Sequence, residues 1–364
     1  MELDSQAVLA VCIGRMRKAI LQKYINKFGI ASLSCDLFND TEIVETLLQG
    51  VNPVARNTVE RDLQKWSESG IQWCTLGSCD FPAQLLTLAV PPLVLFYRGA
   101  SPSGVVLDQS VSVVGSRAAS SFSCDLAAQL GYEVVSHGGG LVSGLALGID
   151  GAAHRGALKG VRDHGDAGGK TIAVLGNGLS SIYPSAHRGL AHGILDAGGT
   201  LLSQFEPSCP PLPHQFLMRN QLIAGYSTTT VVVAAARRSG ALNTARCALE
   251  LGREVVAVPG AFYDIGMVGC NVLIQDGAHL LLKAAEIVQF FAANTIVGAT
   301  SITSKCGEPT NRLQDNILNF IASEGMISQS RIVDSFGNEA CAAITELELA
   351  GVLRALPGGI LALK

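Results

Sequence analysis

Apolar residues near the N-terminus recur at steps of three and four. They form one stripe through Leu9, Ile13, Met16, Ile20, Tyr24 and Phe28, and Gly29 follows. This period predicts an amphipathic helix that ends at the glycine. Two further helices are expected over residues 41–49 and 53–67, because both stretches carry helical periodicity and Pro53 suits a first helical position.

From Ser110 onward, short runs of Val, Ile, Leu and Ala alternate with longer helical stretches. Strands are predicted at residues 110–114, 140–143, 171–175, 200–203, 229–234 and 254–258. Such apolar strands are typical of a parallel sheet that helices cover on both faces, so the fold class is α/β with a doubly wound parallel sheet. Residues 70–100 hold short β-prone runs between Pro and Gly, which predicts an extra edge on this sheet.

The turns after these strands are rich in small residues. The candidates are Gly115, Ser116 and Arg117 after the first strand, Ser143 and Gly144 at the end of the second, Gly176 and Gly178 after the third, and Ser239 and Gly240 after the fifth. In a doubly wound sheet these turns meet at one edge, where backbone N–H groups and an arginine favour a phosphate. A single glycine turn also serves plain chain reversal, so the argument depends on their number.

Three residues before the fifth strand add to this set. Phe216, Arg219 and Asn220 follow a proline-rich loop. Phe216 is either a core residue or, beside Arg219, an aromatic ring on which a nucleic-acid base stacks. Arg219 with Asn220 either caps a helix or contacts the anion. The hypothesis of one anion site requires Arg117 and Arg219 to lie at the same rim.

Composition narrows the classes of function. Of 364 residues, 48% are hydrophobic and 15% are charged, which suits a well-packed core and not a disordered chain. The net charge of −4 is not that of a protein coated with cations, so any nucleic-acid site is expected to be a local pocket. No apolar run reaches the length of about 20 residues that a membrane helix needs, and no signal-peptide pattern is present, so a cytoplasmic protein without a membrane partner is expected.

Metal and disulfide chemistry are not expected. The ten cysteines form no CxxC pair, which favours reduced thiols over a disulfide framework or a zinc site. Asp150 and His154 lie one helical turn apart, which suits a metal or an acid–base pair, but no third ligand is evident nearby. Helix capping and local hydrogen bonds are the favoured interpretation of this pair, and no metal, cofactor or catalytic residue is predicted.

Taken in order, the motifs resemble the DNA-processing protein A family (DprA/Smf). The matching residues are Val114-Gly115-Ser116-Arg117, Ser143-Gly144-Leu145-Ala146 with Gly148-Ile149-Asp150 and His154, Ala173-Val174-Leu175-Gly176 with Gly178 and Tyr183-Pro184, Phe216 with Arg219-Asn220, Ser239-Gly240 with Leu242 and Thr244-Ala245, and Ala257-Val258-Pro259-Gly260. Asn271, Leu273-Ile274 and Gly277-Ala278 complete the set, so the resemblance covers roughly residues 70–285.

The resemblance implies four segments. Residues 1–68 would form a helical module like a sterile-alpha-motif domain, and residues 69–292 an extended Rossmann-type domain. Residues 293–312 would be a linker, and residues 313–364 a winged-helix module, whose match includes Leu347-Glu348-Leu349-Ala350-Gly351 and Pro357-Gly358-Gly359.

The resemblance also implies a function. The protein would be a homodimer that binds single-stranded DNA, protects incoming strands and loads a RecA-type recombinase during natural transformation, without catalytic turnover. Arg117 would contact a backbone phosphate, Arg219 would add charge, Phe216 would stack, and the glycine turns would let the strand approach the backbone.

Three departures from the family pattern bear on affinity and on the dimer surface. Gln204 stands where the family usually has Glu, Gln221 where Arg is common, and Ala234 where an acidic residue is usual. Loss of the positive charge at Gln221 is expected to weaken phosphate contacts, and loss of two acids to offset this in part.

Two other classes of function stay open. One is a nucleotide-processing enzyme of the lysine-decarboxylase-like Rossmann group, of the phosphoribohydrolase type, although that group's Pro-Gly-Gly-x-Gly-Thr-x-x-Glu signature is absent. The other is a scaffold that has lost DNA binding and contacts proteins through the C-terminal module.

Overall fold

A computed structural model describes residues 5–16, 41–103, 109–165 and 169–291, together with short pieces of the C-terminal part at 327–328, 340, 344, 353–356 and 360–363. Two compact units are present, Met1–Ala299 and Thr300–Lys364.

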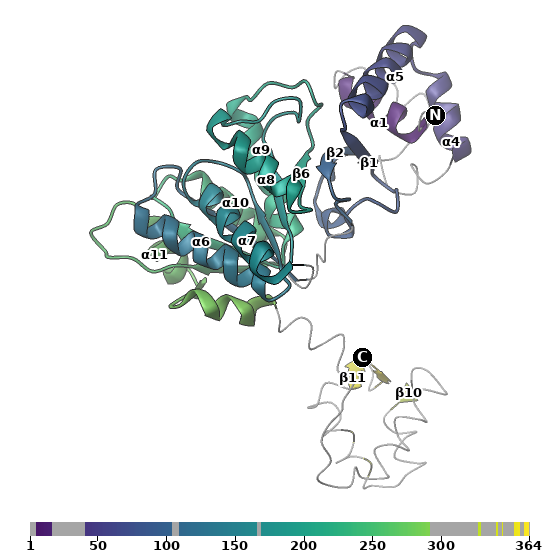
Figure 1. The fold of residues 1–364 in the computed structure, drawn as a ribbon. Helices are drawn as coiled ribbons and strands as arrows, with labels where there is room; N and C mark the ends of the chain where they lie inside the picture. Colours follow the sequence, from purple (N-terminus) through teal and green to yellow (C-terminus); the bar gives the residue numbers. More distant parts are fainter. Residues whose placement is uncertain are drawn as a thin grey trace. The chain divides into compact units, whose positions relative to one another are not determined.

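Among the described residues, three helices open the first unit (Figure 1). They are α1 (Ser5–Arg15), α4 (Thr41–Gln49) and α5 (Pro53–Glu68). The two later helices confirm the predictions over 41–49 and 53–67, and the Asn52 side chain caps α5 by accepting a hydrogen bond from the Val54 N–H at 2.9 Å. Helix α1 ends at Arg15, so the predicted helix through Met16 to Phe28 is wrong at Met16, and its part beyond residue 16, including Phe28 and Gly29, lies outside the described residues.

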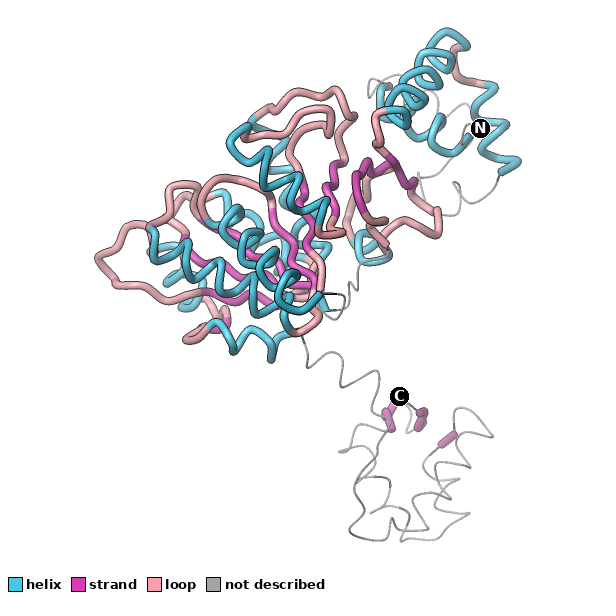
Figure 2. Tube along the Cα trace, viewed as in Figure 1, coloured by secondary structure: helices cyan, strands magenta, loops and turns pink. Residues whose placement is uncertain are grey.

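A nine-stranded mixed sheet follows, in the order β1-β2-β6-β5-β4-β3-β7-β8-β9. The strands are β1 (Gln72–Thr75), β2 (Val94–Gly99), β3 (Ser110–Gly115), β4 (Gly140–Ser143), β5 (Thr171–Val174), β6 (Thr200–Ser203), β7 (Thr229–Ala234), β8 (Glu254–Ala257) and β9 (His279–Leu280). All six predicted strands are confirmed to within one residue. The pairs β1–β2 and β2–β6 are antiparallel and the other pairs are parallel, so residues 70–100 do form an added edge, as Figure 2 lets the reader follow.

The helices between the parallel strands make the sheet doubly wound. They are α6 (Ser121–Ser136), α7 (Ile149–His164), α8 (Arg188–Asp196), α9 (Pro213–Tyr226), α10 (Gly240–Glu250) and α11 (Val268–Gln275). From β3 the chain first moves outward through β4, β5 and β6, then returns to β7 and moves the other way. Right-handed crossovers therefore place α6–α8 on one face and α9 and α10 on the other. Contacts agree with this, since α6 packs on α7 and α9 packs on α10.

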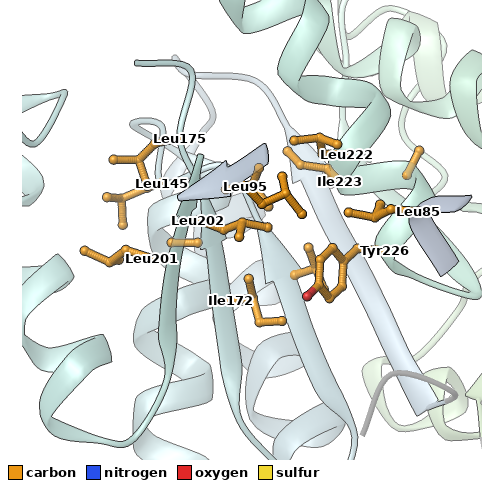
Figure 3. Close-up of a cluster of buried hydrophobic side chains, with 14 of the residues drawn as sticks. Leu85, Leu95, Leu145, Ile172, Leu175, Leu201, Leu202, Leu222, Ile223 and Tyr226 are labelled. Atoms are coloured by element: carbon orange, nitrogen blue, oxygen red, sulfur yellow. The ribbon is translucent and has the colours of Figure 1, made fainter. Parts of the chain in front are cut away.

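Helix α9 is anchored in the core beside the sheet. Figure 3 shows its residues Leu222, Ile223 and Tyr226 among the side chains of Leu95 and Leu202 from the strands. The Tyr226 ring is fully buried, and its hydroxyl donates a hydrogen bond to the Pro102 carbonyl oxygen at 2.6 Å. A buried aromatic with its hydroxyl satisfied holds the C-terminal end of α9 firmly, and the other end carries Phe216 and Arg219.

The second unit contains a small antiparallel sheet in the order β10-β12-β11. Its strands are β10 (Ile327–Ser328), β11 (Leu353–Leu356) and β12 (Ile360–Leu363). The predicted motif residues 347–351 and 357–359 lie outside the described residues, so the winged-helix module stays a prediction. The segment boundaries at 68, 292 and 312 likewise stay predictions. In the described part of the chain, no helix is both long and apolar enough to cross a membrane.

Candidate functional site

A pocket of about 330 Å³ opens where β3 and β7 end, between those turns and the start of α9. It brings together most of the predicted site residues. Those that line it are Gly115, Ser116, Arg117, Phe216, Arg219, Asn220, Ser239 and Gly240. Arg117 and Arg219 therefore line the same pocket, so they do not lie on opposite sides of the molecule.

Backbone hydrogen bonds shape the turn after β3. The Ser116 N–H donates to the Ala234 carbonyl oxygen at 2.8 Å, so the β3 and β7 turns are joined directly. A Cβ atom on Gly115 would lie 2.6 Å from Cγ1 of Ile149, and one on Gly148 would lie 2.3 Å from the Ser116 carbonyl oxygen. Gly148 also has a φ of +74°. Glycine is needed at both positions because α7 begins in contact with this turn.

The N-terminus of α10 faces the pocket. Its first residues Gly240 and Ala241 line the cavity, as does Ser239, whose hydroxyl accepts a hydrogen bond from the Ala241 N–H at 3.3 Å. The unpaired N–H groups of a helix start carry partial positive charge and favour an anion. This end of α10 is thus placed to receive a phosphate group beside Arg117.

A cation and two aromatic rings form the outer part of the site. The Arg117 guanidinium lies 5.1 Å from the centroid of the Phe216 ring, and the Arg117 side chain is exposed. Tyr183 packs on Phe216 with ring centroids 5.6 Å apart and an interplanar angle of 51°. Tyr183 is 45% exposed, so this aromatic pair offers ring surface to solvent next to an exposed cation.

Arg219 lies deeper than Arg117. It is 3% exposed, and its Nη1 atom donates to the carbonyl oxygens of Gly144, at 2.7 Å, and of Val174. Burial lowers the pKa of Arg219 to about 10, and the charge of Asp150 opposes that shift. Its guanidinium therefore binds mainly the carbonyl oxygens at the ends of β4 and β5. The Cζ atom of Arg219 also lies 5.9 Å from the Phe216 ring centroid.

Asp150 completes the floor of the pocket. It is 6% exposed and its Oδ2 accepts a hydrogen bond from the Gly144 N–H at 3.2 Å. Burial raises the pKa of the Asp150 carboxyl, and the charge of Arg219 opposes this. Arg219 and Asp150 thus hold the turn after β4 from its carbonyl side and its N–H side.

Four predicted site residues do not line the pocket. The Ser143 hydroxyl is fully buried and donates to the Val113 carbonyl oxygen at 2.6 Å, which ties β4 to β3. Gly144 supports Arg219 and Asp150, and a Cβ atom on Gly176 would lie 2.6 Å from Cδ1 of the Phe216 ring. Gly178 packs under the Glu206 carbonyl oxygen instead, which a Cβ atom would approach to 2.0 Å. These four residues support the strands, turns and side chains around the pocket, and they do not form its surface.

Sequence reasoning missed Arg238 and Thr244 and gave Asp150 no place in the site, although all three line the pocket. A signal for Arg238 was present, because Arg237 and Arg238 stand directly before the Ser239-Gly240 turn. Asp150 was considered with His154 as a possible acid–base pair. The structure separates the two, since His154 is fully buried and its Nδ1 pairs with the Thr171 hydroxyl at 2.8 Å. Among the described residues, no group of three His, Cys, Asp or Glu side chains could hold a metal ion.

The three departures from the family pattern lie outside the pocket lining. Gln204 and Gln221 are half-buried, and Ala234 is buried and contributes its carbonyl oxygen to the Ser116 N–H. The effect of these residues on affinity stays a prediction.

Comparison with known proteins agrees with the motifs. The family model described as "DNA recombination-mediator protein A" matches residues 72–292. "Protein Smf" of Escherichia coli (strain K12) is 37% identical over 292 residues, which is 78% of this chain and 75% of that protein.

Solved structures match as well. The X-ray structure of DNA processing protein A from Streptococcus pneumoniae has a TM-score of 0.61 at 29% identity, covering 80% of this chain and 99% of that one. A structure of DNA processing protein A from Helicobacter pylori, described as giving insights into a single-stranded DNA binding mode, has a TM-score of 0.52 at 25% identity, covering 62% of this chain and 96% of that one.

Proposed function

The chain belongs to the DNA recombination-mediator protein A family, and from this premise we propose that it binds single-stranded DNA in the pocket between β3, β7 and α9. It acts as a recombination mediator that protects incoming single strands and loads a RecA-type recombinase on them during natural transformation. It works as a homodimer and does so by binding, without catalytic turnover.

The observation that carries this proposal is the position of Arg117 over Phe216. An exposed guanidinium 5.1 Å from a ring, beside the N-terminus of α10, offers a phosphate site and a stacking surface at once. Both groups are what a sugar–phosphate chain with unstacked bases requires. A duplex hides the faces of its bases, so the same pair favours single strands.

The nucleotide-processing enzyme is not favoured. The family match and its DNA-processing relatives point to a binding protein, and the pocket presents its carboxylate, Asp150, in a hydrogen bond to the Gly144 N–H.

The test compares single-stranded and double-stranded oligonucleotides of one sequence in a binding assay across a salt series. The wild-type protein is expected to prefer the single strand. Arg117→Ala should weaken binding and reduce the slope of log K against log salt by about 0.7, the value for one phosphate contact on single-stranded DNA.

Arg162→Ala is the matched control. Arg162 is also exposed, but it stands in the last turn of α7, about 20 Å along the helix from the end that meets the β3 turn. Its substitution should leave affinity and slope unchanged. A slope in Arg117→Ala equal to that of the wild type would remove Arg117 from the site, and equal affinity for both kinds of DNA would refute the proposed preference.

A further inference from the structure

The loop after β8 exposes two neighbouring aromatic residues. Phe262 is 89% exposed and Tyr263 is 77% exposed, and their rings meet edge to face with centroids 5.3 Å apart. Neither ring packs in the hydrophobic core that the described residues form. Large apolar side chains grouped in solvent mark a contact surface more often than chance exposure does.

Hydrogen bonds join the start of this loop to β7 and its end to the turn that follows β7. At its start, the Val258 N–H donates to the Val232 carbonyl oxygen at 3.0 Å, and at its end the Gly269 N–H donates to the Ala235 carbonyl oxygen at 2.7 Å. That turn continues into Arg237 and Arg238, and Arg238 lines the pocket. The aromatic loop therefore begins and ends next to the pocket wall.

The order of the strands puts these features in a row along the carboxyl edge of the sheet. Along the successive strands β5, β4, β3, β7 and β8, Tyr183 follows β5, arginines follow β3 and β7, and an aromatic pair follows β8. Phe216 of α9 packs against Tyr183 and lies under Arg117. From one end to the other the row comprises Tyr183, Phe216, Arg117, Arg237, Arg238, Phe262 and Tyr263. Four strand spacings of about 4.8 Å give a row about 19 Å long, which five to six stacked nucleotides cover at about 3.4 Å each.

Charge along the row suits a polyanion. Arg117, Arg237 and Arg238 are exposed, and in the described part of the chain none of them takes part in an ion pair. The acidic residue of the aromatic loop is Asp264, whose Oδ1 accepts a hydrogen bond from the Gly266 N–H at 2.8 Å. That carboxylate keeps its negative charge, but it follows Tyr263 in the chain, and the charged residues of the row between the two aromatic pairs are Arg117, Arg237 and Arg238.

We propose that Phe262 and Tyr263 form a second base-stacking site, which holds the bases of a single strand whose other end lies in the pocket at Phe216 and Arg117. The proposal rests on the proposed function, because the pocket supplies the first point of attachment. Stacking on aromatic faces tolerates any base, so the second site lengthens the footprint without adding sequence preference.

The test measures the affinity of two oligothymidylates, one about 4 and one about 12 nucleotides long, which respectively fall short of the row and exceed it. In the double variant Phe262→Ala/Tyr263→Ala, affinity for the long strand should fall about ten-fold or more, and affinity for the short strand should stay unchanged. Both side chains are exposed, so the variant is expected to fold, and its thermal unfolding verifies this.

Two matched variants separate stacking from general apolar contact. Phe262→Tyr/Tyr263→Phe keeps both rings and should bind the long strand like the wild type. Phe262→Leu/Tyr263→Leu keeps apolar surface without rings and should lose the long-strand advantage. Equal loss for both strand lengths, or full binding by the leucine variant, would overturn the second site.

A second copy of the chain is the competing occupant of this surface. Sedimentation of the alanine variant distinguishes it, because a change in oligomeric state with unchanged affinity for both strands would assign the rings to an interface instead. If the wild-type protein binds neither strand, the proposed function fails at the pocket itself. If the wild-type protein binds both strands and the alanine variant keeps the wild-type ratio of long-strand to short-strand affinity, the second site alone is refuted.

Discussion

The Arg219 guanidinium donates a hydrogen bond to the Gly144 carbonyl oxygen at 2.7 Å, across 75 residues of chain. Gly144 has no side chain, and a Cβ atom there would lie 2.5 Å from Nη1 of Arg219. The close approach of the two residues is thus possible only with glycine. Arg219 acts mainly as a positioning residue that joins α9 to the end of β4, while Arg117 is the exposed cation of the pocket.

Replacing Arg219 should therefore cost stability before it costs affinity. Arg219→Met leaves two strand-end carbonyls and the buried Asp150 carboxyl without the guanidinium, and the free energy of unfolding should fall by about 3 kcal/mol. Urea unfolding followed by circular dichroism measures this.

Arg238→Met is the matched control, since Arg238 lines the same pocket but is exposed. Its unfolding free energy should change by no more than about 0.5 kcal/mol, while its affinity for single-stranded DNA falls. Equal stabilities of the two variants would show that the buried hydrogen bonds of Arg219 contribute little.

Replacing Gly176 or Gly178 with alanine should have different effects, the first on DNA binding and the second on stability. A Cβ atom on Gly176 meets the Phe216 ring, which is a side chain that can move, so Gly176→Ala should displace the ring and weaken DNA binding. A Cβ atom on Gly178 meets the backbone oxygens of Glu206 and Pro207, which cannot yield, so Gly178→Ala should chiefly lower the melting temperature. Thermal unfolding and DNA titration of both variants test the distinction.

Gly189→Ala is the control for this pair, because it lies in α8 with nothing within 4 Å of its Cβ position. Alanine is favoured over glycine inside a helix, so this variant should be as stable as the wild type or more stable, by up to about 1 kcal/mol. If Gly176→Ala binds DNA normally, the position of the Phe216 ring does not limit binding.

His154 should make stability depend on pH. Burial lowers the pKa of His154 from 6.5 to about 3. The unfolded chain therefore binds more protons than the folded one between these values, and folding stability is lost as the pH falls below 6.5. Between about pH 7 and about pH 5 the loss from this group is about 2 kcal/mol.

His154→Phe should abolish this loss. Thr171 keeps its hydrogen bond to the Leu141 carbonyl oxygen at 3.2 Å when the imidazole is replaced. The raised pKa of Asp150 acts in the opposite sense, since it favours the folded state as the pH falls, but it is present in both proteins. Urea unfolding of both at the two pH values gives the difference, and parallel pH profiles would contradict the assignment.

Arg15 adds an ion pair between the N-terminal helices and the sheet domain, beside the edge-to-face contact of Trp66 in α5 with Phe96 in β2. Arg15 of α1 donates to both carboxylate oxygens of Glu206, from Nε at 2.8 Å and Nη2 at 2.6 Å, and Nη2 also lies 2.7 Å from Asp62 of α5. Glu206→Gln should speed proteolytic release of residues 1–68, with a cost of about 1 kcal/mol because the groups are about one-third exposed. Glu250→Gln, which breaks only the local pair with Arg246 in α10, should be cleaved like the wild type.

Much of the sheet could be predicted because its signal is local. Runs such as residues 229–234 are β-branched and apolar, and they end at turn residues. Each strand can therefore be predicted from its own residues, without knowledge of the neighbouring strands. The same locality explains why Gly115, Ser116 and Arg117 could be assigned to one turn at the carboxyl edge.

The roles within the site could not be assigned in the same way. Arg117 and Arg219 are both arginines beside small residues, and nothing in the chain tells that one is exposed and the other 3% exposed. Gly176 and Gly178 differ in what lies above them, which depends on the Phe216 ring in one case and the loop at Glu206 in the other.

By itself, the amino-acid sequence determined the α/β class, the strand bounds and the set of turns that meet at one edge, because these follow from periodicity and from the chirality of the connections. Tertiary structure alone decided which arginine faces solvent, that Asp150 belongs to the pocket floor, and that the rings of Phe262 and Tyr263 are exposed. Burial and the pairing of charges depend on what packs from distant parts of the chain, and a one-dimensional pattern does not contain that information.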